Sequence, residues 1–245
     1  MTNQPHLLIL GTGHSESIEH WNTNAMIATA QGNLLIDCGF TIKYALRDQG
    51  LSLPEVDAVF ITHVHGDHVF GLERIGYESR FSYGKRTKLY IRETLLQELW
   101  DHTLKGSMGL ASEGENTLED FFEVILLTED HFNYHGVNIK LFNTRHTPLK
   151  TCYGMHINDS VIFTSDTAPI PDVISNLPAH TIFHDVTLRD EHPVHAAVPA
   201  LLSAYTPEFR KKMFLMSYED HWREWNTQID RDFAGFARQG QRVPL

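Results

Sequence analysis

Short apolar runs rich in β-branched residues recur along the chain and alternate with segments whose apolar residues follow helical spacing. The runs predict strands near residues 6–10, 24–30, 33–37, 56–61, 87–91, 121–127, 137–142, 151–157, 160–164, 181–184 and 212–216. Helical spacing predicts helices near residues 40–50, from just after His68 toward Phe81, over 92–105 and near 222–238. Residues 106–116 hold three glycines and little apolar content, so we expect a loop there. The pattern therefore predicts a mixed α/β fold whose strands fall into two halves.

Composition favours one domain over residues 1–245, because 42% of the 245 residues are hydrophobic and no Gly-, Ser- or Pro-rich linker interrupts them. The two cysteines, Cys38 and Cys152, lie far apart, which fits free thiols in a reducing cytosol better than a disulfide. No apolar stretch approaches the length of a membrane span, and the first residues lack the features of a signal peptide. We therefore expect a cytoplasmic protein that binds no membrane.

The hexapeptide HVHGDH at residues 63–68 follows the predicted strand at 56–61 and carries four potential metal ligands. Catalytic groups are commonly displayed on loops held by such a rigid strand end. His63 and His65 are two positions apart, so in an extended segment their side chains point the same way. Imidazole nitrogens with a few carboxylate oxygens suit zinc first, and then manganese or iron. The alternative is a chance cluster in a chain with 16 histidines, but a full match to this pattern favours a metal site.

Two further candidates follow later strands in the same way. His146 comes just after the predicted strand at 137–142, and Asp166 comes just after the one at 160–164. With the hexapeptide, they resemble the signature of the metallo-β-lactamase superfamily, and the resemblance covers nearly the whole chain. It implies an α/β (α+β) four-layer αββα sandwich with the metals along one edge, between the two sheets.

The resemblance also implies a ligand set for two divalent ions, zinc above all, with manganese as the alternative. One ion would be held by His63, His65 and His146, the other by Asp67, His68 and His221, and Asp166 would bridge them. His221 lies beyond the predicted strand at 212–216, whereas the family's last ligand usually lies closer to its strand. No rival histidine is nearby, so His221 is the expected seventh ligand.

The stretch after Asp166 is similar to the branch that contains ribonuclease Z and its phosphodiesterase relatives. In that branch an acidic residue after a strand partners a histidine, and the histidine protonates the leaving oxygen. Asp185 and His195 stand at these places, and a carboxylate-oriented histidine suits proton donation near neutral pH. His192 competes with His195 for this role, and a purely structural role for the pair also stays open. The resemblance further implies that Asp67 accepts a proton from the attacking water.

Charge bears on the size of the substrate. The formal net charge is −11 and the pI is about 5.8, whereas binding to long RNA draws most of its affinity from Lys and Arg. The basic segments 84–88 and 210–212 are better explained as solvated turns, and residues 113–120 are acidic. No basic Gly/Pro-rich arm, with which ribonuclease Z grips transfer RNA, is present in the sequence.

These features favour a small phosphodiester, and 3′,5′-cyclic nucleotides most of all. They fit the resembled small-nucleotide branch, which includes the phage anti-Pycsar proteins that destroy cyclic-nucleotide signals. The first alternative is an endonuclease of transfer-RNA 3′ ends. The second is a lactonase or β-lactamase, which would need no leaving-group acid of the Asp185–His195 kind. A non-enzymatic metal-bearing module would require loss of ligands, yet all seven candidates are present.

The segment 92–116 is the longest part of the chain that the metal site does not require. Leu95, Leu96, Leu99 and Leu104 lie at helical spacing within it, which fits an ordinary core-facing helix as well as a dimer contact. Members of the resembled branch commonly pair, and a small ligand in an edge cleft needs a cover. We therefore expect a homodimer in which residues near 92–116 form the contact or reach toward the partner's cleft.

Overall fold

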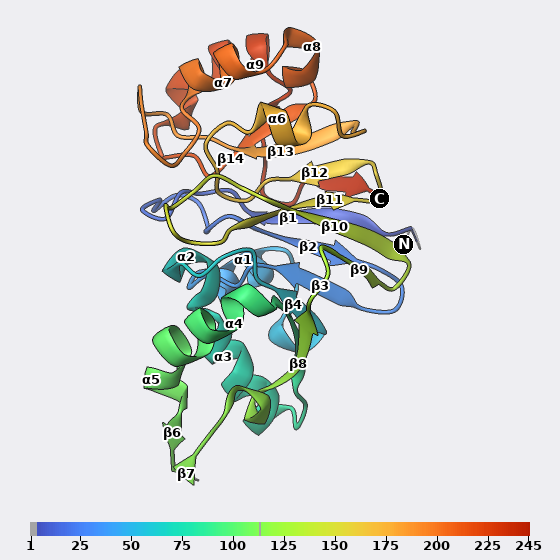
Figure 1. Cartoon of the computed structure of the whole chain (residues 1–245), viewed down its shortest axis with the longest axis vertical. Helices are drawn as coiled ribbons and strands as arrows, with labels where there is room; N and C mark the ends of the chain where they lie inside the picture. The colour runs from blue at the N-terminus through green and yellow to red at the C-terminus, as the bar shows by residue number, and fades with distance from the viewer. Residues whose placement is uncertain (1–3, 113) are drawn as a thin grey trace.

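Two seven-stranded sheets pack face to face in the computed structural model, which describes residues 4–112 and 114–245. Helices cover the outer face of each sheet, so the chain forms four layers (Figure 1). The predicted αββα sandwich is thereby confirmed. Glu113, which belongs to the acidic stretch 113–120, lies outside the described residues.

The first sheet has the order β16-β1-β2-β3-β4-β5-β8. Its strands are β1 (His6–Gly11), β2 (Asn24–Ala28), β3 (Asn33–Ile36), β4 (Ala58–Phe60), β5 (Thr87–Arg92), β8 (Phe122–Leu127) and β16 (Arg242–Pro244). Strands β3, β4, β5 and β8 run parallel, whereas β1 pairs antiparallel with both β2 and β16. The last strand of the chain therefore completes the sheet that the first strand begins.

The second sheet has the order β15-β14-β13-β12-β11-β10-β9. Its strands are β9 (His131–Tyr134), β10 (Val137–Asn143), β11 (Tyr153–Ile157), β12 (Val161–Phe163), β13 (Thr181–Asp185), β14 (Met213–Met216) and β15 (Gly235–Phe236). Strands β12 to β15 run parallel, so their carboxyl ends lie at one edge of the sheet.

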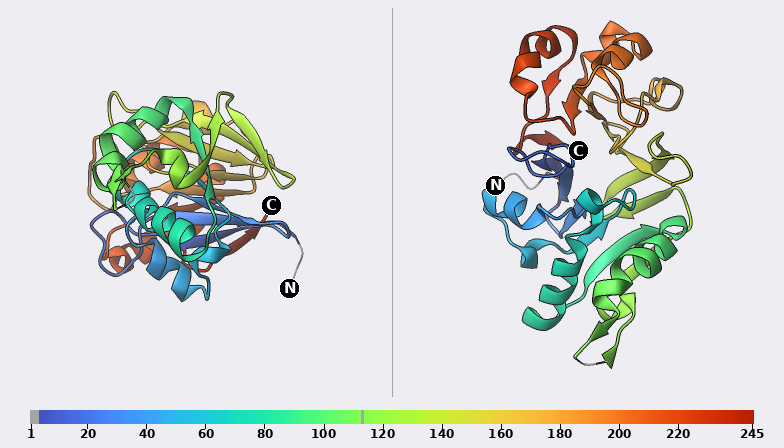
Figure 2. Two further views of the ribbon diagram at one scale, coloured as in Figure 1. Left: turned by 90° about the horizontal axis from the view of Figure 1, so that it is seen from below. Right: turned by 90° about the vertical axis from the view of Figure 1, so that its left-hand side faces the viewer.

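The helices fall into two groups, one on each sheet (Figures 1 and 2). The α-helices are α1 (Ile42–Asp48), α2 (Gly66–Val69), α3 (Leu72–Tyr77), α4 (Glu93–Leu99), α5 (Lys105–Met108), α6 (Pro171–Ile174), α7 (Val198–Ala204), α8 (Pro207–Arg210) and α9 (Asn226–Asp232). Short 3₁₀ turns lie at η1 (Leu53–Glu55), η4 (Leu118–Asp120) and η5 (Trp222–Trp225), and π-helical turns at η2 (Glu78–Ser82) and η3 (Trp100–Leu104). Helices α1 to α5 lie on the side of the first sheet and α6 to α9 on the side of the second.

Successive side chains of a strand point to opposite faces of its sheet. The strands of the second sheet therefore contribute to two apolar layers, one between the sheets and one beneath the helices. Phe163 of β12 and Phe183 of β13 are buried between the sheets, with ring centroids 6.5 Å apart. Their neighbours Ile162 and Ile182 point the other way and pack beneath the helices of the second sheet. Cys38 and Cys152 are buried, free thiols. No helix among the described residues has the length and apolar character needed to cross a membrane.

Several elements differ from the sequence expectation. The helix expected after His68 is divided at Gly71, where an added Cβ would lie 2.4 Å from the carbonyl oxygen of Gly39. The expected loop at 106–116 contains most of α5 and a small hairpin of β6 (Leu110–Ala111) and β7 (Gly114–Glu115). The last helix ends at Asp232, and β15 and β16 follow it. These two strands are too short for a period to be visible in the sequence.

Candidate metal centre

Three loops, each following a strand, meet at one edge of the sandwich. His63 and His65 lie in the loop after β4, His146 follows β10, and Asp166 follows β12. Strand β10 is antiparallel to β11, which is antiparallel to β12, so the ends of β10 and β12 face the same edge. The carboxyl ends of parallel strands are a common place for ligand sites in α/β folds.

Three imidazoles converge at this edge. The Nδ1 atom of His65 lies 3.1 Å from Nε2 of His63 and 3.1 Å from Nε2 of His146. For comparison, zinc–nitrogen bonds in a tetrahedral site place neighbouring nitrogens about 3.3 Å apart. The three side chains form one of the groups in the structure whose atoms are close enough to share a metal ion.

The tautomers also favour a cation at this place. The Nδ1 of His146 donates to the carbonyl of Val194 at 3.1 Å, which leaves a lone pair on Nε2 of the neutral ring. Nδ1 of His65 faces two nitrogens but has at most one proton to donate. Burial lowers the pKa of His63 well below its ordinary value and also lowers the pKa of His65, so both rings favour the neutral, ligating form. A metal ion satisfies all three nitrogens at once.

A second group lies beside the first. Nε2 of His68 is 3.4 Å from Oδ2 of Asp67 and 3.4 Å from Oδ2 of Asp166. Burial opposes a charge on His68, but Asp67, Asp166 and Asp37 outweigh it and raise its pKa well above the ordinary value. Such a concentration of negative charge equally suits a divalent cation.

Asp166 stands between the two groups. Its Oδ2 lies 4.0 Å from Nε2 of His63, 3.8 Å from Nε2 of His146 and 3.4 Å from Nε2 of His68. Burial penalises the charged carboxylate, yet the surrounding histidines, His68 first, hold its pKa well below the ordinary value. Its Oδ1 is buried and has no hydrogen-bond partner. A carboxylate whose Oδ2 lies near nitrogens of both groups and whose buried Oδ1 is unsatisfied fits a bridge between two ions.

Asp37 supports the second group through a hydrogen bond to His68, and it was not predicted as a site residue from the sequence. Asp37 is fully buried at the end of β3, and its Oδ2 accepts a hydrogen bond from Nδ1 of His68 at 2.8 Å. It also accepts from the backbone N–H and the hydroxyl of Thr62, at 2.8 and 2.7 Å. Such a carboxylate fixes the tautomer and orientation of a ligating histidine. The only sequence signal is an acidic residue directly after an apolar strand.

Asp185 and His195 form a pair beside the metal-ligating groups. Oδ2 of the fully buried Asp185 accepts from Nδ1 of His195 at 2.8 Å, and it also accepts from the backbone N–H of Thr167 at 2.9 Å. Burial opposes a charge on His195, but Asp185 outweighs it and raises its pKa to about 9. The ring centroid of His195 lies 4.8 Å from that of His146. This geometry places a protonated imidazole at the edge of the site.

The other histidines of this region have different surroundings. Nδ1 of His192 accepts from the backbone N–H of His195 at 3.1 Å, so this ring stabilises the loop that carries His195. His184 is fully buried and bonds to Tyr205 at 3.0 Å, consistent with a structural role. His14, which the sequence analysis did not consider, is nearly buried, and its ring centroid lies 5.5 Å from that of His195.

His221, the expected seventh ligand, is not brought to the site. It is exposed, it begins the 3₁₀ turn η5, and it belongs to none of the ligand groups among the described residues. The reason lies in the segment after β14. Asp220 accepts from the backbone N–H groups of Ile18 and Glu19 at 2.9 and 3.1 Å, which ties the segment to the N-terminal loop. The structure therefore brings together six of the seven expected ligands and leaves His221 at the surface.

Comparison with known proteins agrees with this geometry. The family model described as "Anti-Pycsar protein Apyc1" matches residues 5–243. An anti-Pycsar protein Apyc1 of Paenibacillus harenae is 38% identical over 221 residues, which cover 88% of this chain and 90% of that protein. The Apyc1 protein of Bacillus phage 010DV004 is 30% identical, with all of both chains covered.

Solved structures show the same fold at low sequence identity. A diphosphatase of the PhnP family has a TM-score of 0.76 at 17% identity, with 99% of this chain and 98% of that chain covered. The short form of human tRNase Z has a TM-score of 0.67 at 19% identity, with 97% and 98% covered. The chain has the metallo-β-lactamase fold, and it belongs to the anti-Pycsar protein Apyc1 family.

Proposed function

We propose that this protein is a hydrolase, namely a dinuclear metal-dependent phosphodiesterase that cleaves small phosphodiesters, and 3′,5′-cyclic nucleotides above all. One observation carries the proposal: the Asp185–His195 pair, joined at 2.8 Å, lies directly beside the carboxylate-bridged ligand groups. Phosphodiester hydrolysis needs an activated water on one side of phosphorus and a proton for the leaving oxygen on the other. This edge of the sandwich offers residues for both tasks.

Six residues would hold the two ions. They are His63, His65, His146, Asp166, Asp67 and His68. When bound, such a pair of ions, zinc or manganese, would clamp the phosphate oxygens and lower the pKa of a water. Asp67 is the least enclosed of the carboxylates, because it lies at the start of α2 with its side chain 16% exposed. We propose that Asp67 also orients the attacking water and accepts its proton.

His195 would protonate the departing sugar oxygen. Its Nδ1 is committed to Asp185, so Nε2 is the nitrogen that can donate. A pKa raised to about 9 keeps the ring protonated at neutral pH. His192 is less suited, because its Nδ1 accepts backbone hydrogen bonds and burial lowers its pKa. A lactonase or β-lactamase would have no use for such an acid, which argues against that alternative.

The surface charge supports a small substrate over transfer RNA. The formal net charge is −11, and the basic side chains of the two candidate segments are largely occupied by backbone carbonyls. Lys85 donates to the carbonyl of Pro54 at 2.7 Å, and Arg210 donates to that of Tyr205 at 2.6 Å. Cations held in this way are less available to phosphates along an RNA strand.

We also propose that the described elements form one domain and that the protein works in a reducing cytosol. Strand β16 returns to pair with β1, so each end of the chain contributes to the first sheet. The two free, buried thiols fit a reducing compartment.

Substrate preference tests the proposal directly. We expect the purified, metal-loaded protein to hydrolyse at least one 3′,5′-cyclic nucleotide faster than precursor transfer RNA or a lactone. The reason is that a leaving-group acid lies beside the ligand groups, while a formal net charge of −11 opposes binding of a long polyanion. Product formation would be followed by chromatography for a panel of cyclic nucleotides, one precursor transfer RNA and one lactone. Faster cleavage of the transfer RNA than of every cyclic nucleotide would refute the substrate assignment.

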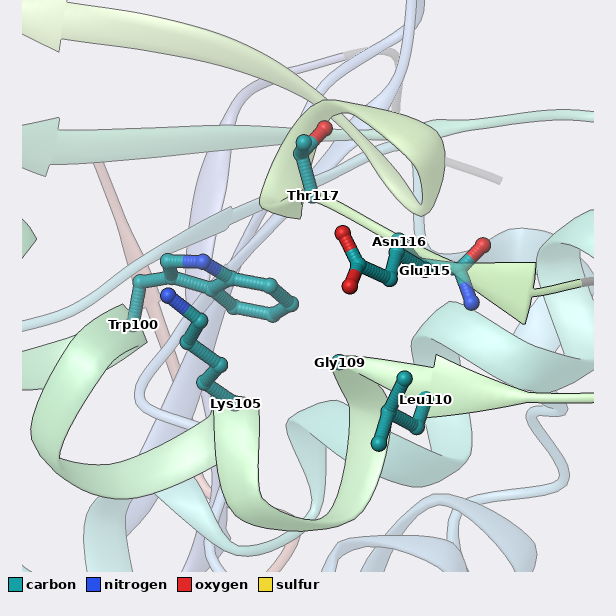
Figure 3. A pocket seen from close by; sticks show the side chains of 7 residues that line it. All are labelled: Trp100, Lys105, Gly109, Leu110, Glu115, Asn116 and Thr117. Carbon is teal, nitrogen blue, oxygen red and sulfur yellow. The ribbon is translucent and has the colours of Figure 1, made fainter.

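We further propose that the chain forms a homodimer through the segment that contains α4, α5 and the β6–β7 hairpin, which projects from the body of the molecule (Figure 1). The side chain of Leu110 at the hairpin is 74% exposed. A hollow of about 660 Å³ opens beside it, and Figure 3 shows Trp100 and Glu115 on its walls. We propose this exposed apolar side chain at the rim of the hollow as a contact with the second copy of the chain.

Light scattering measures this association. We expect about twice the chain mass of 28.0 kDa, and we expect Leu110→Glu to shift the population toward the monomer because a charge at the interface core is unfavourable. Ile18→Glu is the matched control, because Ile18 is a similarly exposed aliphatic residue (87%) outside this segment. A monomer mass for the unaltered protein would exclude the dimer and leave the metal chemistry untouched.

A further inference from the structure

The two ligand groups differ in chemical character. The first presents three imidazole nitrogens, from His63, His65 and His146. The second presents one imidazole nitrogen, from His68, and carboxylate oxygens from Asp67 and the shared Asp166. Nitrogen-rich sites suit zinc, whereas oxygen-rich sites suit harder ions such as manganese and magnesium.

The end of β14 is where a further ligand for the second group would be expected, because β14 lies parallel beside β13 and their carboxyl ends share the edge. The first residue after β14 is Ser217, which is buried (4% exposed) and has a left-handed backbone with φ 69°. Its N–H donates to the carbonyl of Thr12 at 2.9 Å. A neutral hydroxyl is a much weaker ligand than an imidazole or a carboxylate, and His221, four residues later, is exposed.

We propose that the two metal sites are unequal: the three-histidine site holds zinc tightly, and the site of Asp67, His68 and Asp166 holds an exchangeable ion. This inference rests on the dinuclear centre proposed above. Among the described residues, Asp67, His68 and Asp166 offer three donor atoms to this site, so water or substrate oxygens would complete the coordination of its ion. In the presence of excess manganese the protein then becomes a mixed zinc–manganese species.

Metal titration of the apoprotein tests the inequality without reference to catalysis. Zinc content after desalting is measured by elemental analysis, and manganese binding is followed by electron paramagnetic resonance. We expect one zinc per chain to survive desalting and a second ion to be lost, with dissociation constants that differ by about 100-fold or more, as expected for an incomplete coordination shell. Manganese added to the one-zinc protein should occupy the second site and leave the zinc in place.

Ser217→His supplies the missing imidazole and should tighten the second ion by about 10- to 100-fold. Histidine is among the residues that tolerate a positive φ, so the backbone at this position can accept it. Ser203→His is the control, because Ser203 is exposed on the helix α7 and does not follow a strand. If Ser217→His does not fold, Asp67→Asn gives the complementary test: it should abolish the second ion and leave the tightly bound zinc.

Two results would overturn the inference. One is the retention of two zinc ions of equal affinity by the unaltered protein. The other is the loss of the second ion in His221→Ala, which would mean that His221 reaches the site in solution. If the two ions bind with unequal affinity but no phosphodiester is cleaved, only the proposed function is refuted. Cleavage of a cyclic nucleotide by a protein with two equally held ions would instead refute only the inequality.

Discussion

Replacing Asp166 by alanine will remove both ions and reduce turnover by about 10⁴-fold or more. Its Oδ2 lies within 4.0 Å of ligand nitrogens from both groups, so we expect this one carboxylate to serve the two sites at once. Metal ions that clamp a phosphoryl group and lower the pKa of a water each supply several kcal/mol, so losing both accounts for a factor of this size. Elemental analysis at saturating metal, beside a turnover assay, measures the two effects together.

Asp159→Ala is the matched control for this experiment. Asp159 is a carboxylate just before β12, but its side chain is 57% exposed and pairs with Lys140 instead of the ligand groups. It should keep its metal and its activity. Dialysis of the unaltered protein against a chelator should reproduce the loss seen with Asp166→Ala. Turnover that survives complete removal of metal would refute the metal-dependent mechanism.

Replacing His195 by alanine should lower turnover by about 10²- to 10⁴-fold while metal content stays unchanged. His195 is held by Asp185. Its ring lies close enough to His146 and Asp166 to form a further possible ligand group, but the group of three imidazoles does not include it. The loss should shrink with a nitrophenyl phosphodiester, because a nitrophenolate departs without help from an acid. Steady-state assays with a cyclic nucleotide and with this activated substrate separate proton donation from binding.

His192→Ala provides the comparison, since the two rings are neighbours with centroids 4.8 Å apart. It should cost less than His195→Ala and should affect both substrates alike, because His192 accepts hydrogen bonds from the loop backbone. If His192→Ala shows the loss that depends on the leaving group, the acid has been assigned to the wrong histidine. An equal loss on both substrates in His195→Ala would indicate a role in binding or folding.

The sequence predicted most of this site because its information is local. The residues of the hexapeptide at 63–68 are contiguous, and His146 and Asp166 each follow a strand with a clear apolar run. A residue just after a buried strand has its position fixed by the sheet, so a prediction of the strand also places the side chain. The same reasoning located Asp185 at the end of β13.

His221 shows the limit of this reasoning, because the structure leaves it at the surface. Four residues separate it from the end of β14, and its position depends on a left-handed turn at Ser217 and on contacts of Asp220 with the N-terminal loop, about 200 positions earlier. Neither feature leaves a periodic signal in the sequence. The strands β15 and β16 were not predicted for a related reason. Each has only two or three residues, and its place depends on the strand with which it pairs and not on its own sequence.

The buried polar contacts behind the ligands also join the two sheets. The hydroxyl of Thr62, after β4 of the first sheet, lies 2.9 Å from that of Ser165, after β12 of the second, and both contact Asp37. The two sheets thus meet at this edge through hydrogen bonds. Each proposed ligand follows a strand of one sheet, so its position depends on the position of that sheet. Because the proposed ligands come from both sheets, their spacing depends on the thickness of the apolar layer. Substitutions of distant core residues should therefore alter the geometry of the ligand groups without touching a ligand.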